Sequence, residues 1–138
     1  MEPIQDRILV RYIEGLLTEP FAWGRCDCNT IAANWCTFLV GPHRALDLIG
    51  TYDSRLSAKR VSKVLGRWRD YLGDLGFSRI DNGFVQAGDF LIWEGRAYDY
   101  IHIATWGKVL SVHPRIGVRL SKLERVRPDH LVMGVRNG

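Results

Sequence analysis

Residues 21–28 read Phe-Ala-Trp-Gly-Arg-Cys-Asp-Cys, and this run marks where the second helical segment of the chain begins. Asp27 is a typical N-cap residue, and apolar side chains recur at helical spacing after it, so we expect a helix over residues 28–40. Cys28 then lies in the first turn, where free backbone N–H groups and the helix dipole favour an anion. These groups lower the pKa of a thiol, which makes Cys28 a candidate nucleophile. The alternative is a buried core cysteine, which most single cysteines are.

Helices come first in this chain and strands come later. Helical periodicity also appears over residues 4–17 and 57–72, with Ser57 as a suitable N-cap for the latter, whereas residues 43–56 show no clear pattern. After Gly76, short runs of β-branched and aromatic residues alternate with glycine-containing turns. We expect strands near residues 77–80, 89–93, 99–106, 108–112, 115–120 and 131–136. This order indicates an α+β fold, with N-terminal helices packed on a C-terminal antiparallel sheet in one domain over residues 1–138.

The composition is that of an ordinary folded protein with a mild positive charge. The 138 residues are 46% hydrophobic and 25% charged, and the formal net charge is +4. This composition excludes a disordered chain, and the charge suits contact with a polyanion, either nucleic acid or an anionic cell wall. The outward face of the helix expected at residues 57–72 carries five basic side chains, namely Lys59, Arg60, Lys63, Arg67 and Arg69. Because that face has no aromatic stacking platform or known motif, we interpret it as solvated surface and expect no nucleic-acid partner.

The three cysteines are expected to be free thiols. An odd number, with Cys26 and Cys28 one residue apart, is a poor disulfide framework. Cys36 falls on the apolar face of residues 28–40 and is expected in the core, while Cys26 is expected to be a bystander. The N-terminus shows no signal peptide, and no apolar run approaches the roughly 20 residues that cross a bilayer, so we expect no membrane span.

Four histidines are available as a base for the thiol. His43 and His130 are in loop-like sequence and are expected to be solvated. His102 lies inside an apolar strand, and His113 ends the next strand after a turn at residues 106–108. We therefore expect a hairpin in which His102 is the general base and His113 orients it, as the third member of a triad orients the base. The alternative is that backbone groups satisfy both imidazoles.

A zinc site is the other chemistry that these residue types permit. Cys26, Cys28, His102 and His113 include both thiols and imidazoles, which zinc accepts as ligands. Their order along the chain lacks the usual spacing of a structural zinc site, so we expect no metal and no cofactor.

Four motifs of the chain occur in the order and spacing of a known family. They are the run at residues 23–28, Gly88-Asp89 before an apolar strand, the strand at residues 102–106 that begins His-Ile-Ala, and His113 eleven residues after His102. Together with residues 50–54, these motifs resemble the NlpC-type cell-wall cysteine peptidases, a branch of the papain-like fold. The short versions associated with phage tails look most similar. The resemblance covers residues 5–113 and departs from the family at Phe21, where Tyr is frequent.

The resemblance implies a substrate class and a setting. A cysteine peptidase or amidase of the Cys-His-His type would cleave amide bonds in the peptide stem of peptidoglycan, with Cys28, His102 and His113 as catalytic residues. Trp23, Arg25 and Asp27 are expected to bind the substrate. The protein would be made in the host cytoplasm and carried in a phage or phage-like tail tip. It would have tail-tip or hub proteins as partners and act in the periplasm or cell wall.

Two alternatives belong to other classes of function. The first is a catalytically silent structural part of the tail tip that keeps the same fold. The second is a nucleic-acid-binding domain that uses the basic face of residues 57–72.

Overall fold

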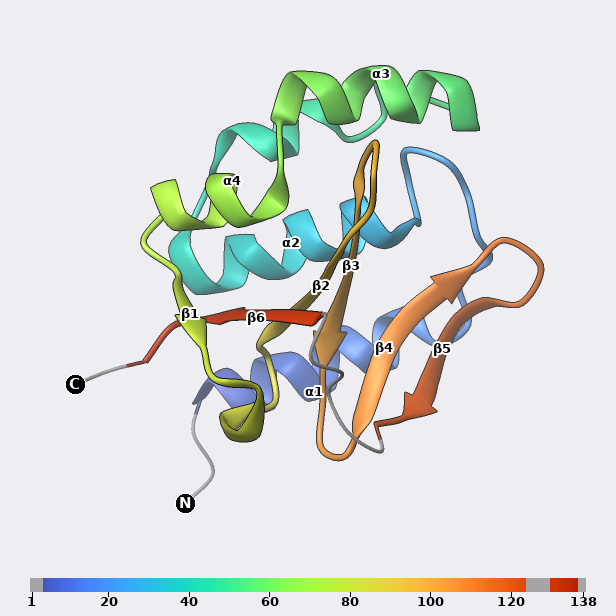
Figure 1. Cartoon of the computed structure of the whole chain (residues 1–138). Coiled ribbons are helices and arrows are strands. Elements are labelled where there is room, and N and C mark those ends of the chain that lie inside the picture. The colour runs from blue at the N-terminus through green and yellow to red at the C-terminus, as the bar shows by residue number, and fades with distance from the viewer. Residues whose placement is uncertain (1–3, 124–129, 137–138) are drawn as a thin grey trace.

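The computed structural model describes residues 4–123 and 130–136 and has an α+β architecture (Figure 1). Its helices are α1 (Ile4–Leu16), α2 (Cys28–Val40), α3 (Arg55–Leu65) and α4 (Trp68–Asp74), with short 3-10 turns η1 (Arg44–Leu48) and η2 (Asn82–Phe84). Its strands are β1 (Ser78–Ile80), β2 (Phe90–Glu94), β3 (Asp99–Ala104), β4 (Lys108–His113), β5 (Gly117–Lys122) and β6 (His130–Gly134). The prediction of helices followed by an antiparallel sheet is therefore confirmed. Within the described residues, none of the helices is long and apolar enough to cross a membrane.

The main core lies between the helices and one face of the sheet. α2 packs on β3, and α1 packs on α2 (Figure 1). Trp35 and Cys36 of α2 are fully buried, as the apolar periodicity of that segment predicts. In α1, Leu9 and Ile13 are buried, but Leu17, which the periodicity placed in the buried stripe, is 43% exposed beyond the end of the helix.

The segment expected to be one helix over residues 57–72 is two helices, so that prediction is wrong. Gly66, at φ +86°, ends α3, and α4 starts as a separate helix at Trp68. α3 also starts earlier than expected, because Ser54 is its N-cap and Ser57 is the third helical residue that completes the capping box. As a result Val64, expected to face inward, is 67% exposed.

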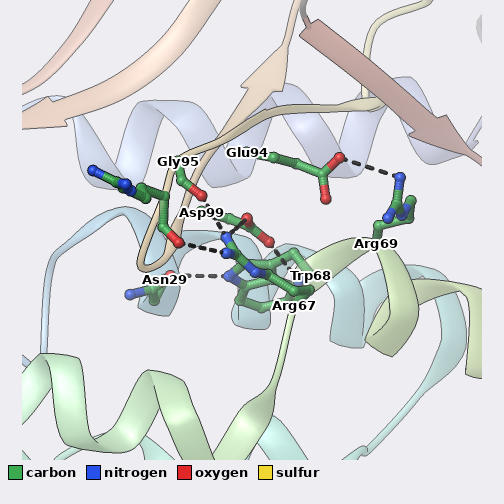
Figure 2. A network of polar contacts seen from close by, with 8 residues as sticks. Asn29, Arg67, Trp68, Arg69, Glu94, Gly95 and Asp99 are labelled. Carbon is green, nitrogen blue, oxygen red and sulfur yellow. Dashed lines mark hydrogen bonds and ion pairs between the residues drawn. The ribbon is translucent and has the colours of Figure 1, made fainter.

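A buried aspartate holds the start of α4 to the turn between β2 and β3 (Figure 2). Asp99, at the start of β3, accepts hydrogen bonds from the Trp68 backbone N–H at 2.8 Å and from the Arg67 guanidinium at 2.7 Å. Arg67 also donates to the carbonyls of Gly95 at 2.8 Å and Arg96 at 3.0 Å. Arg67 was expected on the solvated basic face, but it fixes the tip of the β2–β3 hairpin instead.

All six strands form one antiparallel sheet in the order β1-β6-β2-β3-β4-β5. The helix-facing side holds residues such as Ile92, Ile101 and Ile103, which are almost completely buried. The other side has a smaller apolar cluster of Leu91, Ala104 and Val132. Side chains alternate along each strand, so Tyr100 and His102 of β3 belong to this second side.

Candidate active site

The loop before α2 is fixed by the carboxylate of Asp27. This side chain accepts hydrogen bonds from the backbone N–H of Thr30 and of Gly24, each at 2.8 Å, and from the Tyr52 hydroxyl at 2.7 Å. The Thr30 hydroxyl in turn accepts from the Asp27 N–H at 2.9 Å, which completes a capping box. Asp27 is therefore the N-cap that the sequence predicts, and it sets the position of Cys28 in the first turn.

Gly24 brings this loop against the segment that carries Tyr52. Its φ is +78°, and a Cβ built on it would lie 2.0 Å from the Tyr52 carbonyl oxygen. The Gly24 carbonyl also accepts a hydrogen bond from the Gly50 N–H at 2.8 Å. Only glycine fits here, because both the left-handed backbone and the close approach exclude a side chain.

The structure brings Cys28 and His102 together from positions 74 residues apart. The Cys28 Sγ lies 3.9 Å from His102 Nδ1 and 3.9 Å from the carbonyl oxygen of Val112. Both distances are within reach of a thiol, whose sulfur is larger than a hydroxyl oxygen. The expected contact between Cys28 and a ring nitrogen of His102 is present in the structure.

A gap in the sheet makes this contact possible. Cys28 starts a helix on the core side, whereas His102 belongs to the opposite face. β3 and β4 pair only at Ile103 with Leu110 and at Ala104 with Val109, and the two strands then diverge. Figure 1 shows the N-terminal end of α2 between the diverging strands. The thiol therefore reaches His102 at the edge of β3 that β4 leaves open.

The pair is electrically neutral at pH 7. Burial raises the pKa of the Cys28 thiol to about 11, and the Asp27 carboxylate acts in the same direction. Burial also lowers the pKa of His102, and His130 lowers it further. The expectation that the start of the helix lowers the pKa of Cys28 is therefore wrong, because loss of hydration outweighs the backbone hydrogen bonds that lower it. The resting site holds a thiol beside a neutral imidazole.

His113 is near this pair without a hydrogen bond to it. It is exposed at the end of β4, and its Nδ1 accepts from the Arg115 N–H at 3.1 Å. His102 and His113 line one open hollow of about 330 Å³. The predicted β3–β4 hairpin is confirmed. The alternation of side chains along the two strands assigns both histidines to the same face of the sheet. Among the described hydrogen bonds, none joins the two imidazoles.

The other two histidines were expected to be solvated in loops. That expectation is wrong for His43, whose ring contacts protein groups, whereas His130 begins a strand but lines an open hollow. His130 is the first residue of β6, is half-buried and lines a hollow together with His102. His43 is also half-buried, and its ring nitrogens contact the Tyr71 hydroxyl and, at 2.9 Å, the Ala33 carbonyl. Tertiary packing decides these environments, and loop-like sequence around a histidine does not reveal them.

The three predicted substrate-binding residues have different surroundings. Arg25 is exposed. Trp23 is half-buried, and its ring meets Phe21 edge to face at 4.8 Å between centroids. Asp27 is only 3% exposed, and its oxygens are occupied by the loop hydrogen bonds. Its substrate contact stays a prediction, whereas its structural role is visible.

The Gly88-Asp89 motif has a structural explanation. The Gly88 carbonyl accepts a hydrogen bond from the Trp35 indole N–H at 2.8 Å. The backbone of Gly88 has a φ of +96°, which favours glycine at this position. Asp89 is buried and forms a two-pronged ion pair with Arg136, at 2.8 and 2.7 Å. The motif therefore joins α2 and the segment after β6 to the start of β2.

No group of three or more His, Cys, Asp and Glu side chains in residues 4–123 and 130–136 is arranged to hold a metal ion. The three cysteines are free thiols, and Cys26 and Cys36 are buried.

The chain belongs to a family described as a domain of unknown function (DUF6950), whose sequence model matches residues 3–128. No curated protein and no solved structure matches the chain. The matched region contains Cys28, His102 and His113.

Proposed function

We propose that this protein is a cysteine hydrolase with a papain-like active site, in which Cys28 is the nucleophile and His102 the general base. The observation that supports it is the 3.9 Å approach of the Cys28 sulfur to His102 Nδ1 at the start of a helix. A thiol and an imidazole within proton-transfer range, at a helix N-terminus beside open hollows, are what nucleophilic catalysis requires.

The neutral resting pair implies that the nucleophile forms as the reaction proceeds. His102 Nδ1 removes the thiol proton while the sulfur attacks the amide carbonyl carbon. The carbon–nitrogen bond then breaks, the leaving amine takes the proton from His102, and a thioester remains on Cys28. Water, deprotonated by His102, hydrolyses the thioester and releases a carboxylic acid together with the free thiol.

Backbone N–H groups at the start of α2 supply the oxyanion site in this proposal. Within the described residues, the N–H groups of Cys28 and Asn29 have no backbone or side-chain oxygen as acceptor. The Cys28 N–H lies against its own sulfur and favours the thiolate. Donors in this position stabilise the negative charge that develops on the carbonyl oxygen.

The substrate class and the setting follow from the sequence resemblance. We propose the peptide stem of peptidoglycan as substrate, and a phage or phage-like tail tip as the assembly that carries the protein to the cell wall. In this proposal His113 orients His102 once substrate closes the hollow that both residues line.

One observation favours the silent structural alternative. Burial keeps both Cys28 and His102 neutral, and His102 Nε2 has no hydrogen-bond partner among the described residues. A tail-tip part that had lost activity would retain the fold with such an unactivated pair.

Mass spectrometry of purified peptidoglycan after incubation with the protein separates the two. The hydrolase releases fragments that differ by hydrolysis of one stem amide bond, and the Cys28→Ala protein releases none. Cys26→Ala is the matched control, because Cys26 is buried and none of the described hydrogen bonds joins it to His102, so its fragments should equal those of the wild type. Identical, uncut peptidoglycan from all three proteins would favour the silent structural part.

A further inference from the structure

An aromatic row runs beside the candidate site, from the sheet face away from the main core to the turn between β2 and β3. It consists of Trp93, Tyr100 and Tyr98. The rings of Trp93 and Tyr100 stack with 5.0 Å between centroids, and those of Tyr100 and Tyr98 are 5.2 Å apart. Trp93 is 45% exposed and Tyr100 is 39% exposed, although large aromatic side chains usually bury more of their surface.

The row is continuous with the Cys28–His102 pair. Tyr100 and His102 are alternate residues of β3, and both line a hollow of about 460 Å³ with Trp93 and His130. The pKa of Tyr100 is raised chiefly by its hydrogen bond with Tyr98 and by burial, and the Cys28 sulfur contributes too. A ligand that reaches the thiol from this face therefore passes over Tyr100.

A basic pair, Arg55 and Lys59, stands at the far end of the row. Both side chains are exposed in the first two turns of α3. The Lys59 ammonium lies 5.9 Å from the centroid of the Tyr98 ring. The pKa of Tyr98 is lowered mainly by its hydrogen bond with Tyr100, and the cations of Arg55 and Lys59 lower it further. Positive charge thus meets the end of an otherwise apolar and aromatic surface.

Hydrogen bonds support the row and the hairpin that carries it. The hydroxyls of Tyr98 and Tyr100 are 3.2 Å apart and share a hydrogen bond. The Arg67 guanidinium donates hydrogen bonds to the backbone carbonyls of Gly95 and Arg96, at the hairpin tip just before Tyr98. Asp99, which lies between the two tyrosines in the sequence, accepts a hydrogen bond from the first N–H of α4 (Figure 2). A preformed surface loses little conformational entropy on binding.

We propose that the aromatic row and the basic pair form a substrate subsite that selects a peptide carrying a carboxylate. The peptide lies on Trp93 and Tyr100, and its carboxylate accepts hydrogen bonds from Arg55 and Lys59. The hollow itself is lined by apolar, aromatic and imidazole side chains, so it accepts the uncharged part of the ligand. This inference rests on the proposed function, since the peptide stem of peptidoglycan supplies such carboxylates.

Binding to the Cys28→Ala protein tests the subsite without turnover. Two synthetic stem tripeptides are compared by calorimetry: one with free carboxylates, and one in which each carboxylate is a carboxamide. We expect the acid to bind at least tenfold more tightly at low salt, and the difference to shrink as salt is added. Equal affinity for the two peptides, or no binding of either, would overturn the subsite.

Substitutions in the same background locate the effect. Arg55→Ala combined with Lys59→Ala should weaken binding of the acid about tenfold and binding of the amide less than twofold. Arg60→Ala is the matched control, an exposed cation on the same helix that does not touch Tyr98, and it should change neither affinity by more than about twofold. If the double variant binds the acid as the parent does, the basic pair is not the carboxylate site.

Failure of this proposal is distinguishable from failure of the proposed function. Hydrolysis by the wild-type protein is measured separately on both the acid and the amide peptide. Hydrolysis without preference for the acid removes the subsite only. The protein could instead hydrolyse neither peptide, yet bind the acid preferentially and lose that preference in the double variant. This result would remove the catalytic assignment and leave the subsite.

Discussion

Three neighbours set the chemistry of Cys28. His102 Nδ1 and the Val112 carbonyl each lie 3.9 Å from its sulfur, and the Asp27 carboxylate belongs to the preceding residue. His102 is the proposed base for the thiol proton, the Val112 carbonyl accepts a hydrogen bond from the thiol, and the Asp27 carboxylate raises the thiol pKa. Burial raises that pKa most, so the thiol is favoured at rest, and in the proposed reaction its proton moves to His102 during the attack.

Thiol alkylation should show this protonated state directly. Because burial raises the pKa of Cys28 to about 11, its alkylation rate by iodoacetamide should rise continuously with pH, about tenfold per unit below that pKa. Cys28 should still react before Cys26 and Cys36, which are 7% and 0% exposed. Peptide mass spectrometry of timed samples measures all three rates. A flat rate for Cys28 between about pH 5 and 8 would instead indicate a thiolate–imidazolium pair.

The histidines should differ in their effects on hydrolysis. His102→Ala removes the base and should lower kcat/KM about 100- to 10,000-fold. His113→Gln should keep part of the activity, because an orienting residue holds a proton donor or acceptor in place without moving a proton. The pH profile of kcat/KM for purified peptidoglycan peptides measures both.

A third substitution serves as an internal comparison for that series. His130→Gln removes a group that lowers the pKa of His102, so the acid limb of the profile should move to higher pH. Equal rates for His102→Ala and the wild type would remove the base assignment.

The role of a single residue can be predicted from the sequence when it depends on residues nearby in the chain. Asp27 and Cys28 are visible from the run at residues 21–28, because capping is a local interaction. Tyr52, the third donor to Asp27, is missed as a contact because only tertiary structure brings it there. The raised pKa of Cys28 is missed for the same reason, since burial is a property of the folded chain.

The element that decides the site is the loop from Phe21 to Asp27 together with the segment from Gly50 to Tyr52. Two hydrogen bonds join them, from Gly50 N–H to the Gly24 carbonyl and from the Tyr52 hydroxyl to Asp27. The Tyr52 phenol, from a segment outside the loop, thus supports the Asp27 carboxylate. The start of α2 is thus positioned by contacts outside the helix.

Gly24→Ala should therefore be far more harmful than Gly50→Ala. Both glycines have positive φ, +78° and +83°, so each alanine costs about 1–2 kcal/mol of folding free energy in the left-handed region. At Gly24 the new Cβ also meets the Tyr52 carbonyl oxygen at 2.0 Å, whereas nothing lies within 4 Å at Gly50. The free energy of unfolding, measured with urea, and the rate of hydrolysis should both fall clearly more for Gly24→Ala than for Gly50→Ala. Equal stability of the two variants would show that the loop can move away from the Tyr52 carbonyl without loss of folding free energy.

Elements are predictable where one segment carries its own pattern. The helix at Cys28–Val40 and the β3–β4 hairpin follow from periodicity and turn residues. The break between α3 and α4 does not, because the apolar spacing continues through Gly66. A glycine inside an apolar pattern is compatible with a helix. Only the folded structure shows that α3 ends before Gly66 and that Asp99 accepts a hydrogen bond from the Trp68 N–H where α4 begins.

For the whole molecule, the described buried groups predict loss of stability at both ends of the pH range. His102 has a lowered pKa in the folded state, so its contribution is present above its ordinary value of 6.5 and is lost as pH falls through the lowered pKa. Cys28 and Cys36 have raised pKa values, about 11 and 12, so their contribution is present below the ordinary value of 9.0 and is lost above it. The melting temperature measured across the pH range should therefore be highest between these limits.

Substitution assigns the two limbs of this profile. His102→Gln should flatten the acid limb, because the substituted side chain does not titrate. Cys36→Ala should shift the alkaline limb to higher pH, although cavity formation lowers stability at all pH values. An acid limb that His102→Gln leaves unchanged would assign it to other groups.

At this scale the sequence predicts the order of helices and sheet, but not how the two faces of the sheet meet. The gap between β3 and β4, which lets a thiol from the core side reach His102, depends on strand pairing that ends after Ile103 and Ala104. The alternation of side chains along β3 predicts the face on which His102 lies, but it does not predict where β3 and β4 stop pairing. The contact at the centre of the site is therefore a property of the whole fold.

The most direct test of the central claim is to trap the covalent intermediate. Wild-type protein is mixed with soluble peptidoglycan peptides, quenched with acid after short times, digested and analysed by mass spectrometry, while the released amine is counted in the same samples. We expect an acyl group from the stem peptide on Cys28, formed before or with the first released amine, and neither product from Cys28→Ala. Amine release by Cys28→Ala at the wild-type rate, or an acyl group on another residue, would contradict it.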